Sequence, residues 1–168
     1  MPTIDADAHV IETEHTWDYM DQGEAPFRPR TVSVNNPVEA VSEWWLVDGR
    51  IQPKQDNIGK ETSRESREML DVAARLRHMD ELEVDVQVLY PSLFLRPLTS
   101  RPEVDLALCK SYNRWLSAIW EKGNNRLRWA VIPPLLSMDQ ALKELSFGKQ
   151  HGACARSEER RVGKECRL

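Results

Sequence analysis

Helix-like and strand-like segments alternate between residues 65 and 152, and this alternation constrains the fold more than any other feature of the sequence. Apolar residues recur at three- and four-residue spacing over Glu65–Glu83, which is typical of one face of a helix. The segment Val84–Tyr90 is rich in β-branched residues and stops at Pro91, which is typical of a strand. A helix followed closely by a strand is half of a βαβ unit, in which the strands run parallel.

The same pattern repeats further along the chain. A helix is expected between Ser100 and Gly123, because Ser100 and Glu103 fit a capping box and Gly123 suits a left-handed C-cap. A strand is expected at Leu127–Ile132, and a further helix is expected to begin after Ser137. The sequence therefore predicts an α/β fold in which helices cover a parallel sheet.

Residues 13 to about 60 look irregular and are punctuated by prolines. Within this stretch, Asp48-Gly49 separates two extended-looking runs and predicts a β-hairpin, because both turn residues tolerate positive φ. The adjacent Trp44 and Trp45 would face opposite sides of the first hairpin strand. One of them is expected to cover a hydrophobic patch, and the alternative is that one lines a substrate pocket.

Three polar side chains occupy alternate positions near the start of the chain, at Asp5, Asp7 and His9. Alternate side chains of an extended strand share a face, so Asp7 and His9 are expected to point the same way, about 7 Å apart along the backbone. Metal–ligand bonds are about 2 Å long, so a carboxylate and an imidazole that lean together can share one divalent cation. The plainer interpretation is that of strand-end carboxylates and a hydrogen-bonded surface histidine.

The composition limits the class of protein. The 168 residues suffice for one domain or part of a larger one, and 40% hydrophobic with 30% charged residues is typical of a soluble globular chain. A net charge of −4 gives no reason to expect nucleic acid or an anionic membrane as a partner. No apolar run reaches the roughly 20 residues of a membrane helix, and no signal peptide is evident. Three cysteines without a C-x-x-C pair favour the cytoplasm.

The segment Asp7-Ala8-His9 resembles the metal-binding start of barrels in the amidohydrolase superfamily, whose first strand carries His-x-His or, in some branches, Asp-x-His or Glu-x-His. The most similar branch is the amidohydrolase-related group that includes aminocarboxymuconate-semialdehyde decarboxylase and the resorcylate-type decarboxylases. Further matches follow in order, at Arg75-Leu76-x-x-Met79-Asp80, Val84-Asp85-Val86-x-Val88-Leu89-Tyr90-Pro91, Tyr112-Asn113-x-Trp115-Leu116, Arg126-Leu127-x-x-x-Val131-Ile132-Pro133 and Gly152-Ala153-Cys154.

The resemblance implies a fold. Residues 1–155 would form the N-terminal part of a TIM (β/α)8 barrel, with about three and a half βα units and a long irregular insertion, carrying the hairpin, after the first strand. Residues 156–168 have eight charged residues in thirteen and do not continue the pattern of a buried fourth strand. They look like the translation of a sequencing-library adapter read in frame. We therefore expect a truncated chain with a non-native tail.

The resemblance also implies a site. Asp7 and His9 would hold a divalent metal, expected to be zinc, and Glu12 would either orient His9 or be a solvated loop carboxylate. Asp5 lies deeper and would serve structure. Tyr90 and Ser92 follow the second barrel strand, where a substrate could contact them.

The implied activity is that of a metal-dependent hydrolase or carboxy-lyase acting on a small carboxylate-bearing or acyl substrate. The remaining ligands, a histidine near strand five and an aspartate near strand eight, would lie beyond residue 168, and a catalytic zinc normally has three protein ligands. The fragment itself is therefore expected to be inactive and prone to aggregate. Whether the intact parent is a homo-oligomer stays open.

Two other functions remain open at this stage. Asp5 and Asp7 have the Asp-x-Asp spacing of haloacid-dehalogenase-type phosphatases, although only Met1–Ile4 precede them, where that family has a buried strand. The other is a non-catalytic interaction module of the same fold, in which the Trp-bearing hairpin forms the contact surface.

Overall fold

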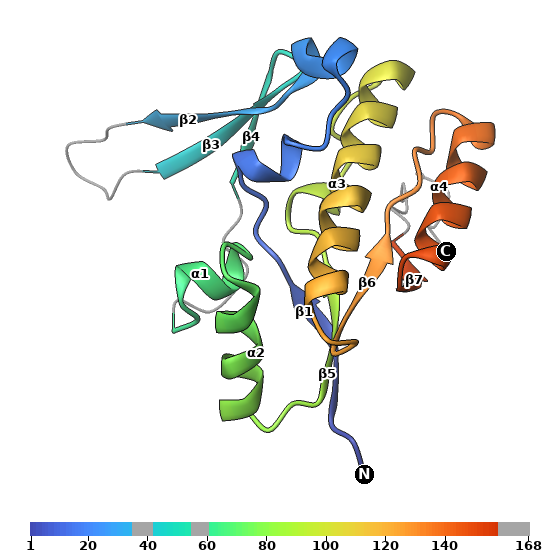
Figure 1. Cartoon of the computed structure of the whole chain (residues 1–168). Coiled ribbons are helices and arrows are strands. Elements are labelled where there is room, and N and C mark those ends of the chain that lie inside the picture. The colour runs from blue at the N-terminus through green and yellow to red at the C-terminus, as the bar shows by residue number, and fades with distance from the viewer. Residues whose placement is uncertain (35–41, 55–60, 158–168) are drawn as a thin grey trace, which may run out of the picture.

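A four-stranded parallel sheet forms the centre of the molecule. The computed structural model describes residues 1–34, 42–54 and 61–157. The strands β1 (Ile4–His9), β5 (Val86–Tyr90), β6 (Leu127–Val131) and β7 (Ala153–Arg156) lie side by side in this order, each parallel to the next (Figure 1). Successive strands of the sheet are adjacent, as in a barrel that is built up strand by strand. The predicted parallel α/β fold is thereby confirmed.

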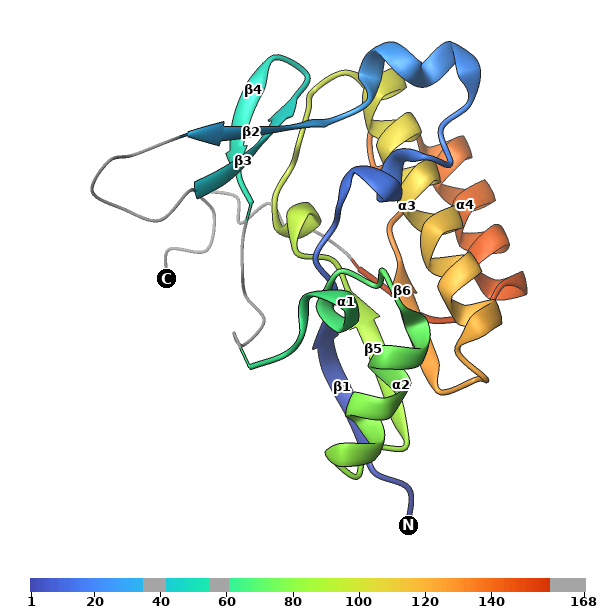
Figure 2. The same ribbon diagram turned by 60° about the vertical axis from the view of Figure 1, so that its left-hand side comes forward.

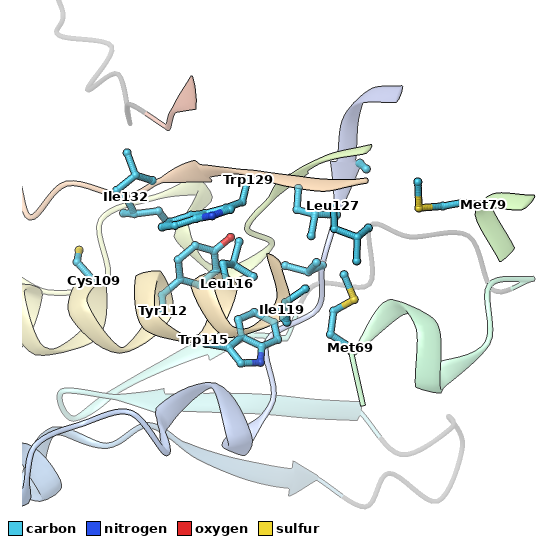
Figure 3. Packing of buried hydrophobic residues seen from close by; sticks show 14 residues of the cluster. Met69, Met79, Cys109, Tyr112, Trp115, Leu116, Ile119, Leu127, Trp129 and Ile132 are labelled. Carbon is cyan, nitrogen blue, oxygen red and sulfur yellow. The ribbon is translucent and has the colours of Figure 1, made fainter. Parts of the chain in front are cut away.

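Three helices pack against one face of this sheet. They are α2 (Val72–Glu81), α3 (Pro102–Lys122) and α4 (Met138–Gln150). Figure 3 shows side chains of α3 meeting those of β6, with Tyr112 beneath Trp129. Burying such side chains removes apolar surface from water and provides the main driving force for folding. The fully or nearly buried members of this core include Leu89, Tyr112, Trp115, Leu116, Leu127, Trp129 and Val131.

A second, antiparallel sheet follows β1. Its strands are β2 (Arg30–Val34), β3 (Ser42–Val47) and β4 (Arg50–Pro53), in the order β2-β3-β4. The predicted hairpin joins β3 to β4, and Asp48 and Gly49 have φ of 47° and 73°. The expectation that residues 13–60 are irregular was wrong for β2 and for the 3-10 helices η1 (Glu14–Trp17) and η2 (Gln22–Phe27).

The small sheet lies over the end of the parallel sheet where β1 and β5 finish (Figures 1 and 2). Trp45 is 1% exposed and packs with Trp17, Leu93 and Leu98, whereas Trp44 is half-buried. The two tryptophans therefore face opposite sides, and Trp45 covers a hydrophobic patch as expected. The hairpin turn is also fastened, because Thr99 Oγ1 donates to Asp48 Oδ2 at 2.5 Å and Arg101 Nη1 donates to Asp48 Oδ1 at 3.0 Å.

The helix expected over Glu65–Glu83 is divided in two. A short helix, α1 (Arg64–Arg67), is separated from α2 by Met69, which has φ of 54°. Met69 is 6% exposed in the main core, so the break turns an apolar side chain inward. The Asp71 side chain then accepts a hydrogen bond from the Ala73 amide and caps α2. Because α1 contains no apolar residue and the apolar spacing begins only at Met69, the pattern did not predict a separate short helix.

The expected caps of α3 differ from the structure. Arg101 is the N-cap residue, without a side-chain cap hydrogen bond, and Pro102 opens the helix. At the other end Gly123 has φ of −84°, whereas Asn124 and Asn125 adopt the left-handed conformation. Gly123 is needed for a different reason, because an added Cβ would lie 2.8 Å from the Cβ of Leu127.

The proposed boundary at residue 156 falls inside β7. Arg156 pairs with Val131, and the Ser157 amide donates to the Val131 carbonyl at 2.9 Å. Residues 158–168 lie outside the described residues, so the non-native origin of the tail stays a prediction. None of the helices in the described ranges combines the length and the apolar character needed to cross a lipid bilayer.

Candidate metal-binding site at the end of β1

A bulge in β1 decides which way its polar side chains point. Asp5 pairs with Gln87, but Ala8 pairs with Leu89, so the two residues between them on β1 lie opposite one residue, Val88, on β5. One additional residue reverses the faces taken by the residues that follow it. The amide of Asp7 donates to Asp5 Oδ1 at 3.2 Å across this bulge.

Asp5 therefore faces the helices. Its Oδ2 accepts a hydrogen bond from Gln87 Nε2 at 2.9 Å, and Gln87 Oε1 accepts one from Arg75 Nε of α2 at 2.7 Å. Burial lowers the pKa of Arg75, while the charge of Asp5 opposes this shift. These contacts agree with the structural role expected for Asp5, although strict alternation along β1 would have placed it on the same face as Asp7 and His9. Sequence reasoning missed Arg75 and Gln87, although Gln87 is a polar residue in an otherwise apolar strand.

His9 lies on the opposite face, because it pairs with Tyr90, the neighbour of the helix-facing Leu89. Its Nε2 is 3.7 Å from Asp7 Oδ1, so the two side chains approach each other as expected. Asp7 is exposed and His9 is largely buried, with 92% and 20% of their side-chain surfaces accessible. The His9 and Tyr90 rings are 6.2 Å apart between centroids. Asp7 and His9 are thus available to a ligand at the carboxyl end of the strand.

The second ring nitrogen of His9 fixes the tautomer. His9 Nδ1 is 2.9 Å from the carbonyl oxygen of Pro91. A carbonyl can only accept, so Nδ1 carries the proton and neutral His9 keeps the lone pair of Nε2 on the side of Asp7. Histidines that bind metals usually donate their other ring N–H to a carbonyl or carboxylate in this way. The backbone at the end of β5 therefore leaves the lone pair of Nε2 facing Asp7.

The expectation that Glu12 is a solvated carboxylate was wrong, whereas its role in orienting His9, which would have to be indirect, stays a prediction. Its side chain is buried, and it accepts hydrogen bonds from the amides of Ser92, at 3.1 Å, and Leu93, at 3.0 Å. Burial raises the pKa of Glu12 to about 7, although these amides and the charge of Lys54 oppose the shift. Glu12 thus joins the segment after β1 to the segment after β5, where the short 3-10 helix η3 (Leu93–Leu95) begins.

Ser92 is also part of this connection. It is 3% exposed, and its hydroxyl donates to the Val10 carbonyl at 2.7 Å. The structure therefore gives Ser92 a structural contact, and a substrate would have to displace it to reach the hydroxyl. Tyr90 is half-buried beside His9, and its contact with a substrate stays a prediction.

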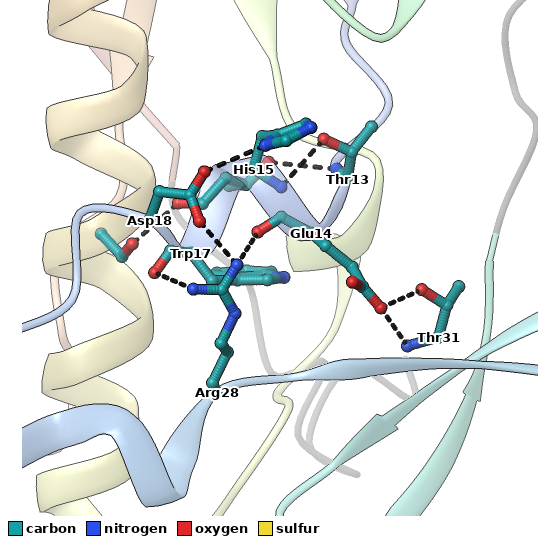
Figure 4. A network of polar contacts seen from close by, with 9 residues as sticks. Thr13, Glu14, His15, Trp17, Asp18, Arg28 and Thr31 are labelled. Atoms are coloured by element: carbon teal, nitrogen blue, oxygen red, sulfur yellow. Dashed lines mark hydrogen bonds and ion pairs between the residues drawn. The ribbon is translucent and has the colours of Figure 1, made fainter.

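A separate polar network holds the loop that follows β1 (Figure 4). Arg28 Nη2 donates to the Glu14 carbonyl at 2.8 Å and to Asp18 Oδ1 at 2.6 Å. The Glu14 side chain accepts a hydrogen bond from the Thr31 hydroxyl at 2.7 Å, which lowers the pKa of Glu14. His15 Nδ1 lies 3.0 Å from Asp18 Oδ2 in the same network. These contacts connect η1 to β2, and they make His15–Asp18 a second, exposed histidine–carboxylate pair for comparison.

A cavity of about 410 Å³ opens above the carboxyl ends of β5, β6 and β7. Its wall is mainly apolar, as is usual for sites that bind small molecules. The half-buried Asp105 contributes a carboxyl group whose pKa is raised by burial, and this carboxyl accepts a hydrogen bond from the Leu136 amide. The main lining residues are Phe94, Arg96, Leu98, Asp105, Ile132 and Leu136.

Asp7 and His9 bring two possible metal donors close to each other. Two protein donors of the right chemistry face each other, and the proton of His9 is held on the far ring nitrogen. Within residues 1–34, 42–54 and 61–157, no three His, Cys, Asp or Glu side chains gather closely enough to hold a metal ion. The pair fits the start of a metal site, and its role in binding a metal stays a prediction.

Comparison with known proteins supports the fold. No protein-family profile and no curated protein matches the sequence. The structure is similar to the crystal structure of an amidohydrolase from Mycobacterium avium subsp. paratuberculosis K-10, with a TM-score of 0.66 and 18% sequence identity. The match covers 90% of this chain and 47% of that chain, so the chain spans about half the length of the solved protein. The chain thus has the fold of part of an amidohydrolase TIM barrel.

Proposed function

We propose that this chain is part of a metal-dependent enzyme of the amidohydrolase superfamily, a hydrolase or a carboxy-lyase, in which Asp7 and His9 are two of the metal ligands. The observation that carries the proposal is the orientation of His9. Its Nδ1–H is bound to the Pro91 carbonyl, and its Nε2 faces the Asp7 carboxylate at the carboxyl end of a barrel strand. Active sites of TIM barrels lie at this end of the strands.

Asp7 and His9 would have different roles in holding the metal. Asp7 would supply a negative charge and His9 a neutral nitrogen donor, held in place by Pro91. A bound divalent metal, which we take to be zinc, would polarise a substrate oxygen or lower the pKa of a bound water. The cavity above β5–β7 would take the less polar part of a small carboxylate-bearing or acyl substrate.

The phosphatase alternative is not favoured by the geometry. It requires Asp5 and Asp7 to act together on one phosphoryl group. The bulge instead directs Asp5 to Gln87 and, through it, to Arg75 on the helix side of the sheet. The similarity to a solved amidohydrolase also favours the first proposal.

Paramagnetic Co²⁺ tests the ligand pair even if binding is weak. Because two ligands bind a metal less firmly than three, we expect low affinity and no turnover from the 168 residues. In NMR spectra, low concentrations of Co²⁺ should broaden the ring signals of His9, and Asp7→Asn should remove this broadening. The exposed His15–Asp18 pair is the internal control, because Asp7→Asn should leave it unchanged. Equal broadening of His9 in the wild-type chain and in Asp7→Asn would refute the proposal.

A further inference from the structure

The segments that follow β1 and β5 are joined residue by residue. The Val10 amide donates to the Tyr90 carbonyl at 3.0 Å, and His9 Nδ1 donates to the Pro91 carbonyl at 2.9 Å. In the opposite direction, the Ser92 hydroxyl donates to the Val10 carbonyl at 2.7 Å. The Glu12 carboxylate, accepting from the Ser92 and Leu93 amides, lies at the end of this series.

One peptide unit connects Glu12 to His9. The Pro91 carbonyl, which accepts from His9, and the Ser92 amide, which donates to Glu12, belong to the same peptide bond. A trans peptide is planar, so its C=O and N–H point in opposite directions and rotate together. No cis peptide bond occurs in the described part of the chain. A rotation of this plane that broke the contact with Glu12 would also turn the carbonyl away from His9.

We propose that Glu12 is a positioning residue that sets the tautomer of His9 through the Pro91–Ser92 peptide. By holding the Ser92 amide, the Glu12 carboxylate aims the Pro91 carbonyl at His9 Nδ1 and keeps the lone pair of Nε2 facing Asp7. The value of this tautomer for metal binding rests on the proposed function. The control of the tautomer by Glu12 does not, because it follows from contacts within the chain.

The chemistry of Glu12 suits this role. Its two oxygens accept from two successive amides, so they fix the turn in both position and rotation. Backbone N–H groups bind an ionised carboxylate more strongly than a neutral acceptor. A glutamine has one acceptor oxygen for these two amides, and its NH₂ group would be buried beside their donors. An alanine would leave both amides without this acceptor. From the wild-type chain to Glu12→Gln to Glu12→Ala, the Pro91–Ser92 peptide is therefore held less and less firmly in its orientation.

The tautomer can be read directly from the ¹⁵N chemical shifts of the His9 ring at pH 8.5. In the wild-type chain we expect a protonated Nδ1 and an unprotonated Nε2. Glu12→Gln should raise the fraction with the proton on Nε2, and Glu12→Ala should raise it further. Glu144→Gln is the matched control, because Glu144 is a similarly buried carboxylate that contacts Asn113 and Arg114 instead. It should leave the His9 shifts unchanged.

The outcomes separate this inference from the proposed function. If Glu12→Ala does not fold, the near-isosteric Glu12→Gln decides, and wild-type His9 shifts in its folded form overturn the inference. A shift of equal size in Glu144→Gln also overturns it, because the effect would then be general destabilisation. If the tautomer responds to Glu12 but Co²⁺ does not broaden His9, the positioning role stands and the metal site fails. If Co²⁺ broadens His9 while the tautomer ignores Glu12, the metal site stands and the positioning role fails.

Discussion

Two buried carboxylates fasten two ends of strands in this molecule, and they do so with different partners. Glu144 of α4 accepts from Asn113 Nδ2 at 2.8 Å and forms an ion pair with Arg114, and Asn113 also binds the Ile132 backbone beyond β6. Glu12, beyond β1, accepts from backbone amides, and no ion pair to it is found in the described part of the chain.

The partners of each carboxylate determine what it is suited for. A carboxylate that is paired with a guanidinium recovers part of the hydration lost on burial through charge-assisted hydrogen bonds, which suits it to hold two elements together. A carboxylate that is buried against amides alone loses more hydration than it regains, and the pKa of Glu12 rises to about 7 for this reason. Glu12, whose burial is less well compensated, lies three residues from His9, at the candidate site. Glu144, whose burial is compensated by Arg114, lies between α3 and α4.

Removing each of the two carboxylates in turn should give the largest changes in the free energy of unfolding. Glu144→Ala leaves Arg114 and Asn113 without their buried partner, and breaking such a pair costs roughly 3–5 kcal/mol. Because the Arg114 side chain is 30% exposed, we expect the low end of that range. Glu12→Ala should cost about 1–2 kcal/mol at pH 8, since it also removes an unfavourably buried charge. Urea unfolding of both variants checks this order, and a larger loss for Glu12→Ala would invalidate the comparison.

The free energy of unfolding should depend on pH through the ionisation of Glu12. Its pKa is raised from 4.5 to about 7 in the folded chain, so between these values the folded state binds more protons than the unfolded state. The stability that Glu12 contributes is therefore complete below pH 4.5 and is lost as the pH rises through 7. At 1.36 kcal/mol per pKa unit the loss is on the order of 3 kcal/mol.

Glu12→Gln isolates this contribution. Urea unfolding of the wild-type chain and of the variant at a series of pH values should give a difference in free energy that changes between pH 4.5 and 7 and is level outside that window. A difference that stays constant from pH 4 to pH 8 would show that Glu12 titrates normally in the folded chain.

The smallest effect is expected from Lys54, the cation whose charge lowers the pKa of Glu12 without a direct contact. Lys54→Met should raise this pKa by a few tenths of a unit, because an interaction over several ångströms is weakened by the surrounding medium. The ¹³C shift of the Glu12 carboxyl group, followed over pH, measures the change. Lys149→Met on α4 is the control and should leave it unchanged. A fall in the pKa of Glu12 in Lys54→Met would contradict the account.

The sequence predicted the order of strands and helices because their periodicities are local and strong. It could not predict the bulge in β1, since Asp5, Asp7 and His9 alternate perfectly and the additional residue is visible only against β5. The burial of Glu12 was equally hidden, because its partners are amides 80 residues away and amides have no sequence signature. For β2, however, the alternating β-branched residues of Arg30–Val34 were a signal that the surrounding prolines obscured.

The hairpin turn helps to hold the insertion after β1 in place. Glycine or asparagine could also supply the positive φ at position 48. Only an acidic residue also offers two oxygens, one for Thr99 and one for the guanidinium of Arg101. The tip of the hairpin is thereby anchored to the residues that lead into α3, and these contacts hold the small sheet over the strand ends. An asparagine at this position would preserve the bend and release the anchor.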